Sequence, residues 1–341
     1  MGVTAIEILE TIRDNASDLY IERIPSATSG NLHQVGQAIS SDTNIMNEFI
    51  QTLVNKIAFS NIKSKMYKNP LERLKGVGVP FGGVIEEIFV NPATDVGFQK
   101  DGTYLLRTTT PDGKTAYYGQ NRQSCYPLSI SEAQLNRAFT SEQEFMSFYN
   151  AIVSALYSGD NIDEFMLSKK MLGLAIDNGA VTFLESDLTK PKELAKALSN
   201  MSKMFTFNST QFNGYNKVNA TAIASGEKPC QTFCPTENQC LLIRVDAQTE
   251  IDYEVLATMF NMEVAKLEAM TILVDEFPSE KYDIYAMLVD KETIQIRDTV
   301  YRPEVEFIKS NLTWNLWLHH WQFIFLSMFG NAVVFGKTKT A

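Results

Sequence analysis

The sequence contains few of the residues that most enzymes use at their active centres. Its 341 residues include three histidines and four cysteines. It has no P-loop, no G-x-G-x-x-G after a strand, no H-E-x-x-H and no G-x-S-x-G. Gly76-Val77-Gly78 and Gly82-Gly83 precede a predicted strand rather than opening a helix, so no helix dipole is available there for a phosphate. The sequence therefore predicts a protein that is not an enzyme, with no catalytic residue, no bound metal and no cofactor.

Positive charge is also scarce. Thirty Lys and Arg residues face 40 Asp and Glu residues, which gives a formal net charge of −10. A protein that grips nucleic acid through its phosphates needs a basic surface, so specific nucleic-acid binding is disfavoured. The acidic balance agrees with ordinary solubility, and also with a container wall that does not adsorb the nucleic acid inside it.

Long apolar runs without polar residues are missing. The first 16 residues carry charged side chains on an amphipathic pattern and do not resemble a secretory signal. The segment Trp314 to Phe335 has about the length of a membrane span but contains several polar residues, namely Asn315, His319, His320, Gln322 and Asn331. Their burial in lipid would be costly, so this segment is expected to form two buried strands and no membrane partner is predicted.

The four cysteines do not form a recognised metal-binding pattern. Cys125 stands alone, whereas Cys230, Cys234 and Cys240 have the spacing C-x3-C-x5-C instead of the paired C-x2-C of structural zinc sites. We expect reduced, unpaired thiols in a loop, where replacement by serine would cost little stability. A metal or redox enzyme that uses these three cysteines is the alternative from a different class of protein.

The remaining candidate pairs fall on predicted strands. His319 and His320 would point to opposite faces of a strand and cannot serve one metal, so each is expected to be a packed, hydrogen-bonded side chain. Glu86 and Glu87 would likewise face opposite sides and cannot form an acid/base pair. The sequence shows no other grouping of acidic residues suited to catalysis.

Helical periodicity is strong in four segments. The first helix runs through Ile6 to Ile12 and the second from about Ile45 to Ala58, with a polar stretch from Ser26 to Thr43 between them. A long helical segment is predicted from 141 to 178, interrupted at Gly159-Asp160, and a further helix from Pro191 to about Met204. The long segment has a continuous apolar face formed by Phe145, Phe148, Tyr149, Ile152, Val153, Leu156 and Tyr157, and a resumed pattern at Ile162, Phe165, Met166, Leu172 and Ile176. Ser141 is its predicted cap and Asn178-Gly179 its stop.

The region between residues 61 and 130 has a different character. Val84 to Val90 and Thr103 to Thr109 read as strands, and Pro111-Asp112-Gly113 reads as a turn before a return strand from Lys114 to Tyr118. The region has few large aliphatic residues but several tyrosines, so it suits neither a buried domain nor a disordered insert. We expect an extended arm whose tip is residues 91–113 and whose partner lies elsewhere.

The last third mixes strands and helices, which makes the chain an α+β protein. Strands are predicted at Leu241–Asp246 and Thr271–Val274, with a helix from Asp252 to Phe260 that is capped by Asp252. Ile284–Val289 and Thr293–Ile296 are expected to form a hairpin about Asp290-Lys291-Glu292.

An ordered series of short runs resembles the major capsid proteins of the phi-29-like podoviruses. The runs keep their order from about residue 44 to 335: Asn69-Pro70-Leu71, Pro80-Phe81-Gly82, Ile85-Glu86-Glu87-Ile88, Asn121-Arg122-Gln123, the helix face Phe145 to Tyr157, Phe260-Asn261-Met262, Trp314-Asn315, His320-Trp321-Gln322 and Phe329-Gly330-Asn331-Ala332-Val333. The individual runs are unspecific, and their common order carries the resemblance.

The resemblance implies the Hong Kong 97-type capsid fold. Under it, residues 1–60 would be an N-terminal arm with helices and 61–130 an extended β-hairpin loop. Residues 131–209 and 311–341 would form a peripheral domain with a spine helix, and 210–310 an axial domain. The immunoglobulin-like domain of some relatives is not expected, because six residues follow the closing strand. The covalent lysine–asparagine cross-link of the fold's namesake is not assigned to this chain.

The resemblance also implies the function. The chain would be a major capsid protein that forms pentamers and hexamers and closes them into an icosahedral shell around double-stranded DNA, without binding that DNA specifically. Portal and scaffolding proteins would be partners, and decoration or tail proteins further candidates. The protein would be made and assembled in the host bacterial cytoplasm and end in the virion. The nearest alternative is the shell subunit of an encapsulin-type nanocompartment.

Overall fold

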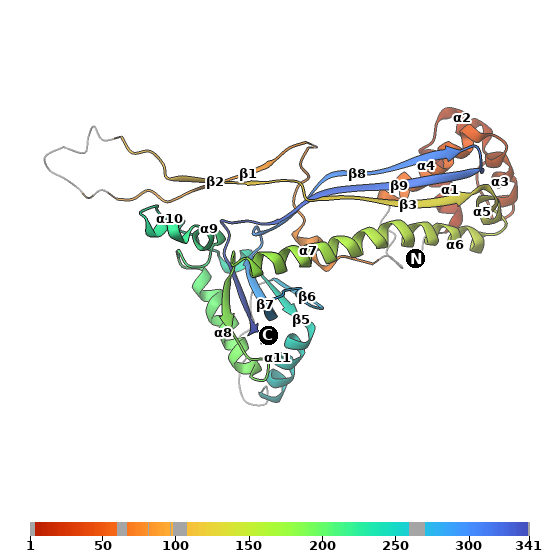
Figure 1. The fold of residues 1–341 in the computed structure, drawn as a ribbon. Coiled ribbons are helices and arrows are strands. Elements are labelled where there is room, and N and C mark those ends of the chain that lie inside the picture. Colours follow the sequence, from red (N-terminus) through yellow and green to blue (C-terminus); the bar gives the residue numbers. More distant parts are fainter. Residues whose placement is uncertain are drawn as a thin grey trace. The chain divides into compact units, whose positions relative to one another are not determined.

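The computed structural model describes residues 4–59, 67–80, 82–95, 97, 108–258 and 270–339. The chain divides into two compact units, each built from three separate stretches of sequence. Unit 1 comprises Met1–Asn69, Arg122–Glu164 and Asp298–Gln322, and unit 2 comprises Pro70–Asn121, Phe165–Arg297 and Phe323–Ala341. The mixture of helices and sheets confirms the predicted α+β class (Figure 1).

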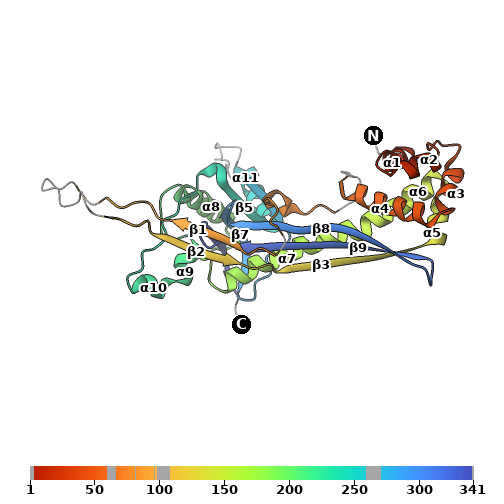
Figure 2. The same cartoon turned by 90° about the horizontal axis from the view of Figure 1, so that it is seen from above.

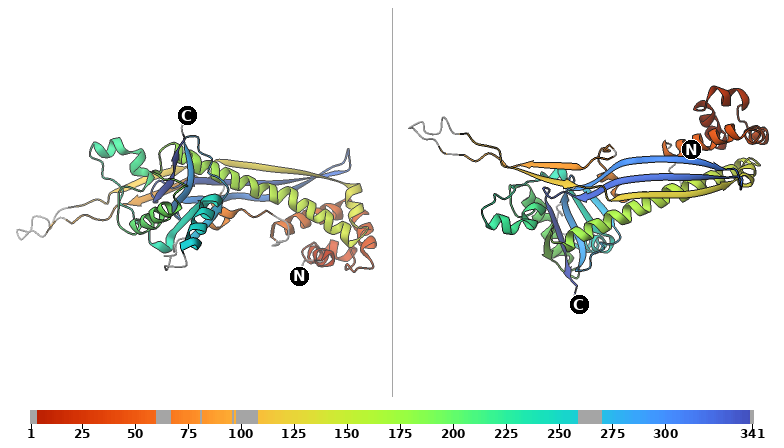
Figure 3. Two further views of the ribbon diagram at one scale, coloured as in Figure 1. Left: turned by 90° about the horizontal axis from the view of Figure 1, so that it is seen from below. Right: turned by 45° about the horizontal axis from the view of Figure 1, so that its top comes forward.

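Unit 1 begins with four helices, α1 (Ala5–Asp14), α2 (Asp18–Arg23), α3 (Leu32–Ser40) and α4 (Thr43–Phe59). Helices α1 and α4 were predicted. The Thr4 hydroxyl accepts a hydrogen bond from the backbone N–H of Glu7 while the Glu7 carboxylate accepts one from the backbone N–H of Thr4, so a capping box starts α1. Helices α2 and α3 were not predicted, and α3 lies within the stretch expected to be polar and irregular. These helices gather beside α5 and α6 (Figure 3).

The predicted long helix is present. After α5 (Glu132–Ala138), α6 (Glu142–Val153) begins at the Ser141 cap, passes through a π-helical turn (Ser154–Ser158) and continues as α7 (Gly159–Asp177). Gly159 does not interrupt it, because the irregularity is the π turn just before that residue. The helix stops at Gly179, whose φ of 73° suits glycine.

A three-stranded sheet packs against these helices in unit 1. Its strand order is β3 (Arg122–Ser131), β9 (Thr313–Leu326), β8 (Ile294–Ile308). The last residues of β9 and the first residues of β8 belong to unit 2. Alternate residues of β9 point into the core, where Trp314 and Leu316 belong to the same hydrophobic cluster as Phe145 and Tyr149. Residues 122–130, which were expected in the extended loop, form most of β3.

Unit 2 is built on a five-stranded sheet. The strand order is β4 (Thr182–Glu185), β10 (Ala332–Thr338), β7 (Tyr282–Asp290), β5 (Gln239–Arg244), β6 (Met270–Val274). The predicted strands are present, but the predicted hairpin is wrong. β7 pairs with β5 and β10, whereas β8 joins the three-stranded sheet, so the turn between β7 and β8 links two different sheets.

Helices cover both faces of this sheet. α8 (Pro191–Phe205) and α11 (Val245–Thr258) contact each other and pack on one face, and part of α7 packs on the other. The predicted helix start at Asp252 is wrong, because α11 begins directly after β5. The short elements of the unit are η1 (Pro70–Leu74), α9 (Gly214–Val218), α10 (Ala220–Ala224) and η3 (Thr236–Asn238). No helix among the described residues is long and apolar enough to cross a membrane.

A two-stranded hairpin extends from the rest of unit 2 (Figures 1 and 2). It pairs β1 (Ile85–Val90) with β2 (Gly113–Tyr118). Both strands were predicted, but the second was expected to return from a turn directly after Thr103–Thr109. The predicted turn at Pro111-Asp112-Gly113 is wrong, since Gly113 pairs with Val90 at the end of the ladder. The expected strand Thr103–Thr109 lies mostly outside the described residues.

The side chains of the three clustered cysteines are not exposed. Cys230, Cys234 and Cys240 are fully buried and reduced, and Cys125 is exposed. Cys234 and Cys240 lie in core clusters on opposite faces of the five-stranded sheet. Burial raises the pKa of Cys230 to about 11 and that of Cys240 to about 12, so both remain thiols at neutral pH. The prediction of a loop therefore holds for Cys230 and Cys234, which lie outside helices and strands, and is wrong for Cys240, which lies in β5.

We predict that Cys240→Ser destabilises the protein by about 1–3 kcal/mol, because the serine hydroxyl would be buried among apolar side chains. Cys125→Ser is the matched control and should change the free energy of unfolding by no more than about 0.5 kcal/mol. Denaturant unfolding followed by circular dichroism measures both. Equal effects of the two substitutions would contradict the burial described above.

Candidate functional site

Charged and amide side chains from four elements meet in the interior of unit 1. β3 supplies Arg122, α7 supplies Asp160 and Glu164, β8 supplies Asp298, and β9 supplies His320 and Gln322. Apart from Asp298, which is partly buried, each of them is no more than 2% exposed. We call these six residues the buried polar cluster.

The first turns of α7 present an unexpected face to the interior. The predicted apolar pattern included Ile162 and Met166, but these side chains are 44% and 50% exposed. Asp160 and Glu164, one helical turn apart, point inward instead. A π turn holds one residue more than an α turn, so residues counted at helical spacing through it do not keep a common face. The expectation that no acidic residues are grouped is therefore wrong.

The guanidinium of Arg122 connects β3 to α7. Its Nη2 donates to Asp160 Oδ1 at 2.6 Å and to the Tyr126 hydroxyl at 2.9 Å. Its Nη1 donates to Gln322 Oε1 and lies 3.7 Å from Glu164 Oε2. Burial alone would disfavour the positive charge, but the adjacent carboxylates outweigh it and raise the pKa of Arg122.

His320 lies between two carboxylates. Its Nδ1 is 2.7 and 2.8 Å from the two oxygens of Asp160, and its Nε2 is 3.0 Å from Asp298 Oδ1. The edge of the ring meets Tyr301 at a centroid distance of 4.6 Å. The prediction of a packed, hydrogen-bonded histidine is confirmed for His320, and His319 lies on the opposite face of β9, partly exposed.

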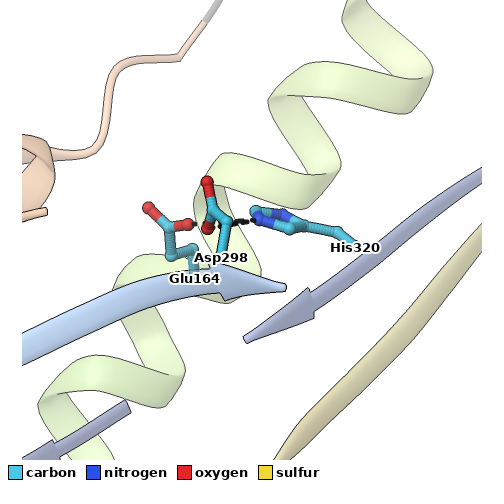
Figure 4. A group of neighbouring side chains, drawn as sticks. All are labelled: Glu164, Asp298 and His320. Carbon is cyan, nitrogen blue, oxygen red and sulfur yellow. Dashed lines mark hydrogen bonds and ion pairs between the residues drawn. The ribbon is translucent and has the colours of Figure 1, made fainter. Parts of the chain in front are cut away.

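Glu164, Asp298 and His320 place three possible metal-ligand atoms within 4.8 Å of one another, the one such group among the described residues (Figure 4). The Gln322 amide nitrogen donates to Asp298 Oδ1 at 2.7 Å and also to Glu164 Oε2. An amide nitrogen cannot ligate a cation, and the Arg122 bond to Gln322 Oε1 fixes the amide in this orientation. Protein donors thus satisfy the carboxylates in this structure, where the three side chains form a hydrogen-bonded, ion-paired group.

A second candidate site is the hairpin of unit 2. One of its faces packs on its own unit, where the Tyr118 ring stacks on Phe325 at 3.9 Å and Phe89 stacks on Phe329 at 5.4 Å. Glu87 on this face accepts hydrogen bonds from the Tyr118 and Ser327 hydroxyls at 2.8 and 2.6 Å. These contacts fix the base of the hairpin.

Polar contacts hold the far end of the two strands. Lys114 Nζ lies 2.8 Å from Glu227 and 3.4 Å from Asp112. The Asn91 amide donates to Asp112 at 2.7 Å and to the carbonyl of Pro229 at 3.1 Å. The hydrogen bond from Asn91, helped by Lys114, lowers the pKa of Asp112. The expected tip of the arm, 91–113, therefore includes residues that anchor the hairpin.

The other face of the hairpin has no partner within the described part of the chain. Val84, Ile88, Val90 and Tyr117 are 62%, 64%, 54% and 68% exposed there, and we call these residues the open face. Glu86 lies on the same side and accepts a hydrogen bond from the Tyr117 hydroxyl at 3.0 Å. Glu86 and Glu87 thus face opposite sides, as predicted. Clustered exposed apolar side chains mark an interaction surface.

Comparisons with known proteins agree with these features. The family model described as "Phi29-like phage major capsid protein" matches residues 9–336. The major capsid protein of Bacillus phage B103 is 29% identical over 98% of this chain and 74% of its own length. That of Streptococcus phage Cp-1 is 28% identical over 96% of this chain and 93% of its own. The predicted resemblance is confirmed, and it favours a phage shell over a nanocompartment or a cysteine-based enzyme.

Solved structures support the fold. The capsid structure of Staphylococcus phage Andhra superposes with a TM-score of 0.61 at 11% identity, covering 81% of this chain and 86% of that one. A chain from the structure titled "Structure of head fiber and inner core protein gp22 of native bacteriophage P68" gives a TM-score of 0.60 at 13% identity with the same coverage of each chain. The chain has the Hong Kong 97-type capsid fold and belongs to the family of Phi29-like phage major capsid proteins, which form the shell of the virion.

Proposed function

We propose that this chain forms pentamers and hexamers that close into an icosahedral shell, and that the open face of each hairpin is covered by a neighbouring copy. The observation that carries the proposal is the open face itself. It places four large apolar side chains, each more than half exposed, on one side of a two-stranded hairpin. Isolated two-stranded hairpins are marginally stable in water, so such a surface favours a partner.

The hairpin offers the partner two kinds of contact. Burying apolar side chains contributes roughly 25 cal/mol for each Å² removed from water. Among the described residues, no further strand pairs with the outer edges of β1 and β2, so their backbone groups are available to a partner. Each contact between copies is modest, but a closed shell repeats it many times, which makes the whole assembly durable.

The capsid fold and the strand pairing together suggest how the domains are distributed along the chain. Residues 1–60 form the N-terminal arm, 61–130 contain the extended loop, 131–209 and 311–341 contain the peripheral domain with its spine helix, and 210–310 contain the axial domain. Because β4 and β10 pair with β7 in one sheet, we assign these two strands to the axial domain instead of the peripheral domain. Likewise β3 pairs with β9, so it belongs to the peripheral domain.

The partners follow from the same function. The shell encloses double-stranded DNA without specific binding, which agrees with the net charge of −10. Portal and scaffolding proteins, and decoration or tail proteins, complete the particle. The protein has no catalytic role, and the near-complete burial of Asp160, Glu164 and His320 supports this because a substrate could not reach them. Assembly in the host cytoplasm agrees with four free cysteines.

We predict that the purified full-length chain forms capsomer-sized oligomers or shells at high concentration or when a scaffolding protein is supplied. Negative-stain electron microscopy and sedimentation velocity measure this directly. A chain that stays a compact monomer under both conditions would contradict the proposal.

The tip of the hairpin gives a sharper test. We predict that replacing residues 94–109 with a short Gly/Ser turn leaves a folded subunit, because Asn91, Asp112 and Lys114 keep their anchoring contacts. The variant should melt near the parent temperature but fail to close shells, since the lost contacts are between chains. A matched control that deletes 91–113 removes the anchors and should also lower the melting temperature. Normal shells from the shorter deletion would contradict the role given to the tip.

A further inference from the structure

We propose that the buried polar cluster is a proton-dependent latch, in which protonated His320 joins the first turns of α7 to strands β8 and β9, and loss of its proton at alkaline pH releases this joint. The inference concerns unit 1 alone. It does not depend on shell assembly.

The geometry around the ring requires two N–H donors. Both ring nitrogens of His320 face carboxylate oxygens, Nδ1 at 2.7 Å from Asp160 and Nε2 at 3.0 Å from Asp298. A neutral imidazole has one N–H and one lone pair. In that form one nitrogen would present its lone pair to an oxygen that also carries negative charge. Only the imidazolium donates to both carboxylates.

The charges that face His320 also favour the proton. Asp160 and Glu164 come from α7, Asp298 from β8 and Arg122 from β3. Three carboxylates against one guanidinium leave two negative charges, and the imidazolium reduces this to one. The remaining polar and titratable neighbours are Asn69, Tyr126, Tyr157, Asp163, Tyr301 and Gln322.

Burial makes these charges interact strongly. Asp160, Glu164 and His320 are no more than 2% exposed, so solvent screens them little. Removal from water opposes the charge on the ring, but the hydrogen bonds to Asp160 and Asp298 outweigh it and raise the pKa of His320 above its ordinary value of 6.5. The stability that the proton contributes is therefore fully present below about pH 6.5, and it is lost as the pH rises through the folded-state pKa.

The latch lies where the helix is least regular. The π turn at Ser154–Ser158 leads directly into α7, and Asp160 is the second residue of that helix. A π turn replaces the i→i+4 hydrogen bonds of an α-helix by i→i+5 bonds, and such turns are frequent at functional sites. Asp160 and Glu164 join the helix just after this turn to His320, Arg122 and Gln322.

The test measures the melting temperature of the full-length chain between pH 6 and 9.5. We expect the parent to lose roughly 2–4 °C for each pKa unit that separates folded from unfolded His320. His320→Gln cannot carry the proton and should lose this pH dependence. His319→Gln is the matched control, because His319 lies next to it on the opposite face of β9, and it should follow the parent curve.

A second variant keeps the histidine. Asp298→Asn removes the charge beside Nε2, so the fall in stability should begin at a lower pH than in the parent. If His320→Gln does not fold, two other measurements test whether His320 is protonated. They are the pH at which Asp298→Asn begins to lose stability and the ¹⁵N chemical shifts of the labelled histidine rings. Imidazolium shifts at pH 7 support the latch. Parallel curves for the parent and His320→Gln, an unshifted curve for Asp298→Asn, or a neutral ring at pH 7 would each overturn it.

Discussion

The structure depends on one constraint, which is that a two-stranded hairpin has two faces and the described residues of its own unit cover only one of them. The stacked rings of Tyr118 on Phe325 and Phe89 on Phe329 cover the first face. Ile88, Val90 and Tyr117 on the second remain in water. The ion pair between Lys114 and Glu227 holds the hairpin in place without covering that face. On the function proposed here, these side chains become buried when copies of the chain associate into a shell.

Much of the fold could be predicted from the sequence because its helices are long and strongly periodic. The segments that became α1, α4, α8 and the α6–α7 helix follow from apolar spacing alone, as β1 follows from its flanking glycines and proline. Helix α2 has six residues, and α3 has nine and lies in the stretch rich in serine, glycine and asparagine. Such short elements carry little periodic signal. The partner of β7 could not be predicted from the neighbouring turn, because β10 lies more than 40 positions away.

The buried polar cluster was harder to predict, since its six residues come from four elements. One signal was present in the sequence, because His320 and Gln322 share the strand parity of Trp314, Leu316 and Leu318 and are therefore expected on the buried side. No comparable signal identified Asp160 and Glu164, whose neighbours Ile162 and Met166 looked like the core residues. The burial of the three clustered cysteines was also not predicted. Their spacing excluded a standard zinc site but gave no information on burial, and the small thiols fill the core.

The central claim is that the open face becomes buried when copies of the chain associate. It is tested most directly by placing a cysteine at Ile88 in a Cys125→Ser background, where the remaining thiols are buried, and measuring its rate of labelling by a maleimide. The account predicts rapid labelling of the free subunit and strong protection in assembled shells. Equal labelling rates in the two states would contradict it.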